Sequence, residues 1–264
     1  MQPEQIIFFD VETTGLSRTT DRVVQIAWVL TDRRGNISSK QNLVVKPEGY
    51  TIPAQASAIH GIDTQSALRF GKSAFEVLSS FAADAKKADI VVGHNVAFDL
   101  GIAGADLRRH AIDLSFNDKV QICTMRSSTG WCRIPKTNGL PGYKFPRLEE
   151  LHYRLFGHDF EHAHDAMADV LATMRCFYEL IRLEVIQLPK PVVTNENVSN
   201  HAPNNQAQAS AGAGRKRASQ NVSGFALTRH VRAACAHCST IIDVTLNHGE
   251  TQIACPACHR INRA

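Results

Sequence analysis

The chain has 264 residues, of which 44% are hydrophobic, and a formal net charge of +4. This length allows one sizeable core and a second small module. There is no signal-peptide pattern and no apolar run near the roughly 18 residues that span a membrane. These features argue against secreted and membrane-spanning classes and predict a soluble cytoplasmic protein.

The charge is distributed unevenly. Residues 190–264 carry eight Lys and Arg against three acids, whereas residues 1–189 carry 21 against 22. A basic tail is expected where a chain meets a polyanion or an acidic partner. A solvated tail without a partner is the alternative.

Residues 5–188 show the pattern of an α/β domain. The elements expected from residue type and periodicity are strands at 5–12, 22–32, 37–46, 88–95 and 118–125, and helices at 73–87, 96–110, 146–157 and 166–183. Residues 33–36 (RRGN) suit a hairpin turn, and residues 127–146 are expected to form an irregular loop. Strands followed by alternating helices and strands predict a mixed sheet flanked by helices.

The composition changes after residue 188. Residues 189–224 are rich in Asn, Gln, Ala, Ser and Gly, and are expected to form a disordered linker because they offer too little apolar surface to offset the entropy of ordering. We therefore expect three parts: a domain at 1–188, the linker at 189–224, and a small module at 225–264.

Four acids stand at the ends of predicted elements. Asp10 and Glu12 are two residues apart on the first strand and should face the same side of the sheet. Asp99 lies in the first turn of one helix and Asp169 in the first turn of another. Each has an ordinary explanation, since the helix dipole favours Asp in a first turn. Together they offer the oxygen ligands that hard divalent cations prefer.

His164 precedes Asp169 by five residues, an offset of about 140° on one ideal helix. A better arrangement makes Asp165 the N-cap, with Asp169 one turn inside the helix and His164 on the preceding loop. There His164 would approach a metal site without being a ligand. A surface histidine is the plain alternative.

The segments FDVETTG, GHNVAFD and HAHDAMAD resemble, in order and spacing, the three motifs of the DEDDh (DnaQ-like) exonucleases. The resemblance covers most of residues 6–180. The four residues between His164 and Asp169 match the histidine branch of the family. No position of this set departs from the pattern.

The resemblance implies a ribonuclease H-like fold and hydrolysis from the 3′ end of DNA or RNA. It places Asp10, Glu12, Asp99 and Asp169 around two Mg²⁺ or Mn²⁺ ions, with His164 as general base. Two metal ions about 3.5–4 Å apart activate a water and stabilise the leaving oxygen. Neutral imidazole suits removal of the water's proton near neutral pH.

The resemblance also suggests substrate contacts. Thr13, Thr14 and Gly15 follow the first two acids and would approach the terminal nucleotide, where Gly allows close backbone contact. His60, in the segment AIHGI, and Phe98 are further candidates. An ordinary turn explains Thr13 to Gly15 equally well, and core packing explains Phe98.

Four of the seven cysteines form two C-x-x-C pairs, Cys235 with Cys238 and Cys255 with Cys258, in a spacing typical of zinc sites. The sequence between the pairs predicts two short strands around an Asn-His-Gly turn. A closed Cys₄ site holding one structural Zn²⁺ is therefore expected, in a zinc ribbon that has too little core to fold without its metal. Redox disulfides, or mixed ligation through His237, His248 or His259, are the alternatives.

The motifs predict a metal-dependent 3′→5′ exonuclease that releases nucleoside monophosphates from single-stranded or frayed DNA. An RNA-trimming exonuclease fits the same motifs. A nucleic-acid-binding adaptor with an inactive nuclease fold is an alternative of another class. Nucleic acid is the expected partner, with a protein partner at the zinc ribbon as a further option. A homodimer is also open, since dimers occur in the family.

Overall fold

The computed structural model describes residues 4–137, 139–161 and 163–189, and beyond them the backbone of residues 228–234, 241–247, 252–254 and 261–263. The chain divides into two compact units, Met1–Glu196 and Asn197–Ala264. The expected linker from residue 190 on and all four C-x-x-C cysteines lie outside the described residues. Within the described part, no helix has both the length and the apolar character needed to cross a bilayer.

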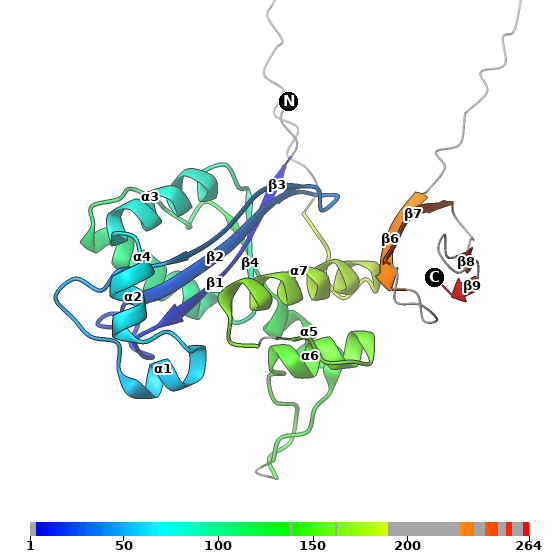
Figure 1. Ribbon diagram of the computed structural model, residues 1–264. Helices are drawn as coiled ribbons and strands as arrows, with labels where there is room; N and C mark the ends of the chain where they lie inside the picture. The colour runs from blue at the N-terminus through cyan, green and yellow to red at the C-terminus, as the bar shows by residue number, and fades with distance from the viewer. Residues whose placement is uncertain are drawn as a thin grey trace, which may run out of the picture. The chain divides into compact units, whose positions relative to one another are not determined.

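A five-stranded sheet forms the centre of the first unit, with the strand order β3-β2-β1-β4-β5 (Figure 1). Its strands are β1 (Gln5–Thr13), β2 (Val23–Asp32), β3 (Ile37–Val44), β4 (Ile90–Gly93) and β5 (Val120–Cys123). β1, β2 and β3 pair antiparallel, whereas β4 and β5 continue the sheet in parallel with β1. The mixed sheet expected from the sequence is confirmed.

Seven helices surround this sheet in the described residues: α1 (Ala54–His60), α2 (Thr64–Phe70), α3 (Ala74–Ala85), α4 (Val96–Arg109), α5 (Thr124–Cys132), α6 (Leu148–Phe156) and α7 (Ala166–Arg182). α3 and α4 cover one face, and α5, α6 and α7 lie on the other. α1 and α2 lie beyond the end of β1 (Figure 1).

Three helices differ from the sequence-based expectation. α1 and α2 were not predicted, although Asp63 and Ser66 form a capping box at the start of α2. The expectation of an irregular loop over 127–146 is wrong for residues 127–132, which belong to α5. This helix is rich in Ser, Thr and Gly, and the Thr129 hydroxyl donates to the Met125 carbonyl within it. Such residues have low helix propensity, so packing on α6 and α7 stabilises α5.

The side chains of β1 alternate between two cores. Ile7, Phe9 and Val11 pack against α3 and α4, whereas Ile6 and Phe8 pack under α7. The period of two then continues the second face with Asp10 and Glu12. α7 begins above Asp10 and Glu12, so the apolar side chains that pack on this face of β1 end where these two acids begin.

In the second unit, the described backbone forms β6 (Thr228–Ala234), β7 (Ile241–Asn247), β8 (Gln252–Ala254) and β9 (Ile261–Arg263). β7 and β8 are the two strands expected between the cysteine pairs. They pair antiparallel with β6 and β9 respectively.

Candidate active site

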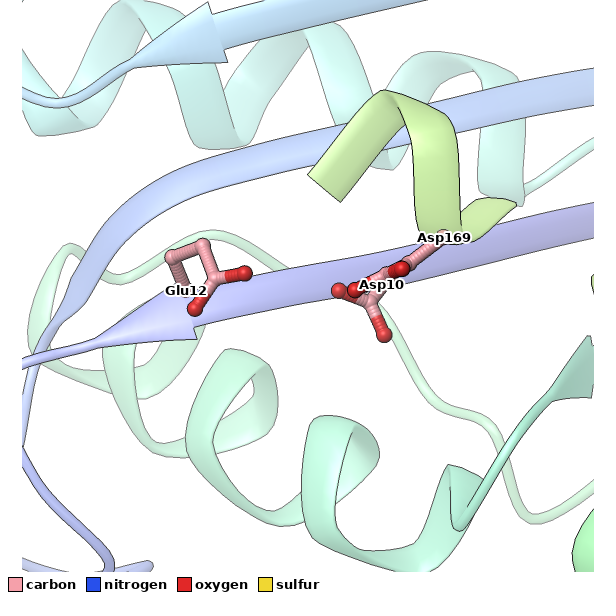
Figure 2. Close-up of side chains that lie close together, drawn as sticks. All are labelled: Asp10, Glu12 and Asp169. Carbon is pink, nitrogen blue, oxygen red and sulfur yellow. The ribbon is translucent and has the colours of Figure 1, made fainter. Parts of the chain in front are cut away.

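Three carboxylates meet at the end of β1. One oxygen from each of Asp10, Glu12 and Asp169 lies within 4.8 Å of the others. Figure 2 shows the first two on the same side of β1 and the third in the first turn of α7. The prediction that Asp10 and Glu12 share a face and meet Asp169 is confirmed.

Asp99 completes the acidic site from the opposite layer. It lies in the first turn of α4, as predicted, and is 3% exposed. It falls outside the group of three defined by the 4.8 Å separation. Its charge nevertheless helps to raise the pKa of both Asp10 and Glu12, so it acts on the same small volume.

The four acids are held with raised pKa values. Burial is the largest cause in each: it raises the pKa of Glu12 to about 8, of Asp99 to about 7 and of Asp169 to about 6. The pKa of Asp10 is raised well above its usual value by burial and then by the charges of Asp99, Asp169 and Glu12. In the described residues, none of the four forms an ion pair with a basic side chain. Oxygen ligands that are partly or fully buried and have no ion-pair partner fit divalent cations such as Mg²⁺.

The start of α7 is fixed as the sequence predicted. The Asp165 carboxylate caps the helix by accepting from the Met167 and Ala168 amides at 3.1 and 3.0 Å. His164 stands on the loop before it with a positive φ of 70°. Its amide donates to Asp169 at 3.2 Å, which orients that carboxylate. Its side chain is 57% exposed, and Nε2 lies 3.9 Å from Glu149 Oε1 on α6.

Gln25 also positions α7, and sequence analysis missed it. This residue of β2 is 6% exposed and lies opposite Glu12 in the sheet. Its Oε1 accepts from the Ala166 amide at 3.4 Å, and its Nε2 donates to Asp165 at 3.5 Å. The signal was a single polar side chain in the apolar run VVQIAWVL.

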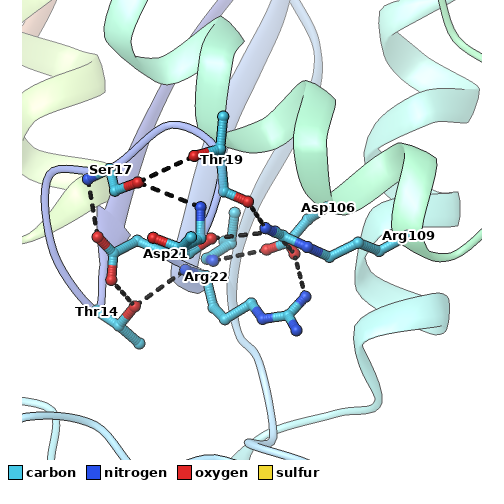
Figure 3. Close-up of polar contacts among 9 residues, drawn as sticks. Thr14, Ser17, Thr19, Asp21, Arg22, Asp106 and Arg109 are labelled. Carbon is cyan, nitrogen blue, oxygen red and sulfur yellow. Dashed lines mark hydrogen bonds and ion pairs between the residues drawn. The ribbon is translucent and has the colours of Figure 1, made fainter.

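The turn after β1 is held by its own side chains (Figure 3). The Thr13 hydroxyl donates to the Gly15 carbonyl, and the Thr14 hydroxyl donates to Asp21, both at 2.7 Å. The other carboxylate oxygen of Asp21 accepts from the Ser17 amide at 2.8 Å. The hydroxyls of both threonines therefore shape the turn.

The same turn is tied to α4 by a second cluster (Figure 3). The buried Asp106 carboxylate accepts from the Val23 amide at 2.7 Å and pairs with Arg22 and Arg109 at 3.3 and 2.7 Å. Arg109 also donates to the Thr19 and Asp21 carbonyls. The sequence did not indicate these residues, because every contact in the cluster except that of Asp106 with Arg109 joins positions more than 80 residues apart.

Two further candidates lie near this turn or behind it. The ring of His60, at the end of α1, contacts the Thr13 backbone. Burial lowers the pKa of His60, and the contact with Thr13 partly offsets this decrease. Phe98 packs partly buried against the core between the sheet, α3 and α4. The structure therefore brings His60 to the end of β1 and gives Phe98 a packing role.

The exonuclease family model matches residues 7–177, well over half of the chain. The chain belongs to the exonuclease family. A curated relative, the PolC-type DNA polymerase III of Latilactobacillus sakei, is 29% identical over 180 residues, which are 68% of this chain and 11% of that protein. The chain therefore spans about a tenth of that relative's length.

Solved structures of E. coli exonuclease I have a fold similar to that of this chain. The complex with a dA16 oligonucleotide is 26% identical with a TM-score of 0.58, over 68% of this chain and 41% of that one. The zinc-bound form of the complex with single-stranded DNA has the same identity and TM-score, over 69% and 41%. The ribonuclease H-like fold implied by the three motifs is confirmed.

The turn gives a first test of the site. Replacing Gly15 with alanine would place a Cβ 2.7 Å from Asp21 Oδ2, so the Asp21 contacts must shift. Because small displacements of reacting groups cost up to about 10²-fold in rate, we expect kcat/KM for hydrolysis of the substrate to fall about tenfold or more. Gly130→Ala is the control, since nothing lies within 4 Å of its Cβ. Equal activity of both variants would mean that the turn does not position substrate.

Proposed function

We propose that this protein is a metal-dependent 3′→5′ exonuclease that acts on single-stranded or frayed DNA. The observation that carries the proposal is the group of Asp10, Glu12 and Asp169 carboxylates within 4.8 Å of one another, with buried Asp99 beside them. Four acids would repel a phosphodiester unless cations were present. The likeness to a protein solved with a dA16 oligonucleotide favours DNA over RNA.

In this proposal, Asp10, Glu12, Asp99 and Asp169 hold two Mg²⁺ or Mn²⁺ ions. The ions would supply an activated water and stabilise negative charge on the phosphate and the leaving oxygen. His164 accepts the proton of the water as its oxygen bonds to phosphorus. The bond between phosphorus and the 3′ oxygen of the preceding nucleotide breaks, and that oxygen takes up a proton. A nucleoside 5′-monophosphate leaves.

Thr13, Thr14, Gly15 and His60 would contact the terminal nucleotide from the turn at the end of β1. The position of His60 against the Thr13 backbone supports this assignment. Phe98 receives no support of this kind, because it packs against the core.

The reaction and its substrate are tested together by product analysis. DNA and RNA of the same sequence are incubated with the full-length protein and Mg²⁺, and the products are identified by mass spectrometry. The proposal expects deoxynucleoside 5′-monophosphates to appear faster than ribonucleoside 5′-monophosphates. Faster release from RNA would make the protein an exoribonuclease. No product from either substrate would favour the adaptor.

His164→Ala tests the general base. Loss of a general base costs typically 10² to 10⁴ in rate, so we expect kcat to fall by about that factor while Mn²⁺ binding stays unchanged. His158→Ala, on the exposed loop before α7, is the matched control. Normal turnover of His164→Ala would remove the general-base role.

For the C-terminal unit we propose one Zn²⁺ held by Cys235, Cys238, Cys255 and Cys258, in a module at 225–264 that binds nucleic acid. The spacing of the two C-x-x-C pairs supports the site. We expect one equivalent of zinc in the purified protein, lost in Cys235→Ser/Cys255→Ser, and a weaker salt dependence of DNA binding when residues 225–264 are deleted. Zinc retained by the double variant would exclude this ligand set.

A further inference from the structure

Exposed aromatic side chains are concentrated in one segment of the described chain. Six aromatic side chains are exposed in the described residues, and four of them lie between residues 131 and 153: Trp131 (37%), Tyr143 (44%), Phe145 (53%) and Tyr153 (56%). Phe70 and Phe75 are the other two. A concentration of exposed apolar rings marks an interaction surface.

Two of these rings stand on a defined arm, residues 133–137 and 139–147, which we call the α5–α6 hairpin. Pro135 and Tyr143 form an antiparallel bridge, and the Lys144 amide donates to the Ile134 carbonyl at 2.9 Å. Figure 1 shows the segment between α5 and α6 extending away from the sheet. The aromatic rings are therefore presented on an ordered projection.

The base of the hairpin is anchored by His94. Its Nε2 donates to the Pro146 carbonyl at 3.0 Å, and its Nδ1 lies 3.0 Å from the Thr124 hydroxyl. Burial lowers the pKa of His94, which favours the neutral ring. The arm is thus fixed before a ligand arrives, which reduces the entropic cost of binding.

The charge of this segment has one sign. Residues 125–148 contain five basic residues and no acid: Arg126, Arg133, Lys136, Arg147 and Lys144. Only Lys144 forms an ion pair within the described residues, with Glu150. The Arg126 guanidinium lies 5.6 Å from the centre of the Phe145 ring. Cations interleaved with aromatic rings are the recognition chemistry of single-stranded nucleic acid.

The hairpin also leads directly to the acidic site. It runs into α6, and Glu149, in the first turn of that helix, is the residue whose Oε1 lies 3.9 Å from His164 Nε2. Phe145 is four residues before Glu149. The arm is therefore continuous with the helix that reaches His164 beside the acidic site.

We propose that the α5–α6 hairpin binds the single strand on the 5′ side of the scissile end, by stacking bases on Tyr143 and Phe145 and by contacting phosphates with Arg126 and Arg147. This inference rests on the proposed function for the position of the 3′ end. The ligand is a single strand, because paired bases present no free faces for stacking.

The test is binding without turnover. The full-length protein in EDTA is titrated into 5′-fluorescein dT16, and affinity is read from fluorescence anisotropy. Stacking on an aromatic ring is lost in Tyr143→Ala/Phe145→Ala, so we expect the Kd to rise about fivefold or more. The matched control, Phe70→Ala/Phe75→Ala, removes two rings outside the hairpin that are more exposed than the test pair, at 70% and 60%, and should keep the wild-type Kd. Tyr143→Phe, which keeps its ring, should also keep it.

Three results would overturn the hairpin proposal: wild-type affinity in Tyr143→Ala/Phe145→Ala, an equal loss in the control pair, or equal effects of the variants on a blunt 16-base-pair duplex. A parallel titration with U16 compares the affinity of the protein for RNA with its affinity for DNA. Hydrolysis of thymidine 5′-monophosphate p-nitrophenyl ester by the wild-type protein with Mn²⁺ tests the proposed function alone. Binding in EDTA does not depend on that reaction, so the two proposals can fail separately.

Discussion

Asp10→Asn is expected to lower nucleotide release from single-stranded DNA by about 10³-fold or more. The carboxylate belongs to the group of three in which each ligand oxygen lies within 4.8 Å of the other two. Losing it weakens the hold on the metal ions, which supply several kcal/mol of transition-state stabilisation, and each 1.36 kcal/mol is tenfold in rate. Release of labelled mononucleotide at saturating Mg²⁺ measures the effect.

The fold should survive this substitution. The pKa of Asp10 is raised well above its usual value, so the neutral asparagine resembles the form that the metal-free protein prefers. We expect Asp10→Asn to unfold in EDTA at the wild-type temperature or higher. Asp113→Asn, at an exposed acid after α4, is the control and should keep full activity. Activity of Asp10→Asn within tenfold of wild type would refute the assignment of Asp10.

Mg²⁺ is expected to raise the unfolding temperature, and most strongly at high pH. A ligand at 100 times its Kd stabilises the native state by about 2.7 kcal/mol, which corresponds to about 5–10 °C for a domain of this size. Protons compete for the same carboxylates. The shift should therefore be largest near pH 8 and shrink toward pH 6.

Without metal, the stability of the folded protein should fall as pH rises. Glu12, Asp99 and Asp169 have folded-state pKa values of about 8, 7 and 6, above their unfolded values, so the native state binds more protons between about pH 4 and pH 8. The stabilising effect of those protons is fully present below about pH 4 and is lost as pH rises through 6 to 8.

Thermal unfolding by circular dichroism, in EDTA and in Mg²⁺ from pH 5.5 to 8.5, measures both trends. The difference between wild type and Glu12→Gln isolates the contribution of Glu12, whose pKa is raised to about 8. This difference should favour the variant increasingly as pH rises. A pH-independent difference, together with no shift on adding Mg²⁺, would contradict a cation site.

Much of the site follows from local sequence. The period of two along β1 places Asp10 and Glu12 on the face that α7 covers, and Asp165 as N-cap fixes Asp169 one turn into the helix. Both are short-range rules of strand and helix geometry, so the sequence suffices. The position of His164 on the preceding loop follows from the same cap.

The supporting contacts do not follow from local sequence. Gln25 reaches the start of α7 across about 140 residues, and Asp106 holds the turn before β2 across more than 80. The helices α1, α2 and α5 are short, and tertiary packing decides whether such segments are helical. The described residues of 133–146 form an irregular loop, as expected, but the bridge of Pro135 with Tyr143 and the contact of His94 with Pro146 do not follow from local sequence.

The central claim is that the carboxylates at the end of β1 hold metal ions that drive hydrolysis from a 3′ end. The most direct test is a time course of 5′-labelled single-stranded DNA with the full-length protein, in Mg²⁺, in EDTA, and in EDTA followed by excess Mg²⁺. We expect a ladder that shortens one nucleotide at a time in Mg²⁺, stops in EDTA and resumes when Mg²⁺ returns. Immediate release of a labelled mononucleotide, or shortening that continues in EDTA, would contradict the account.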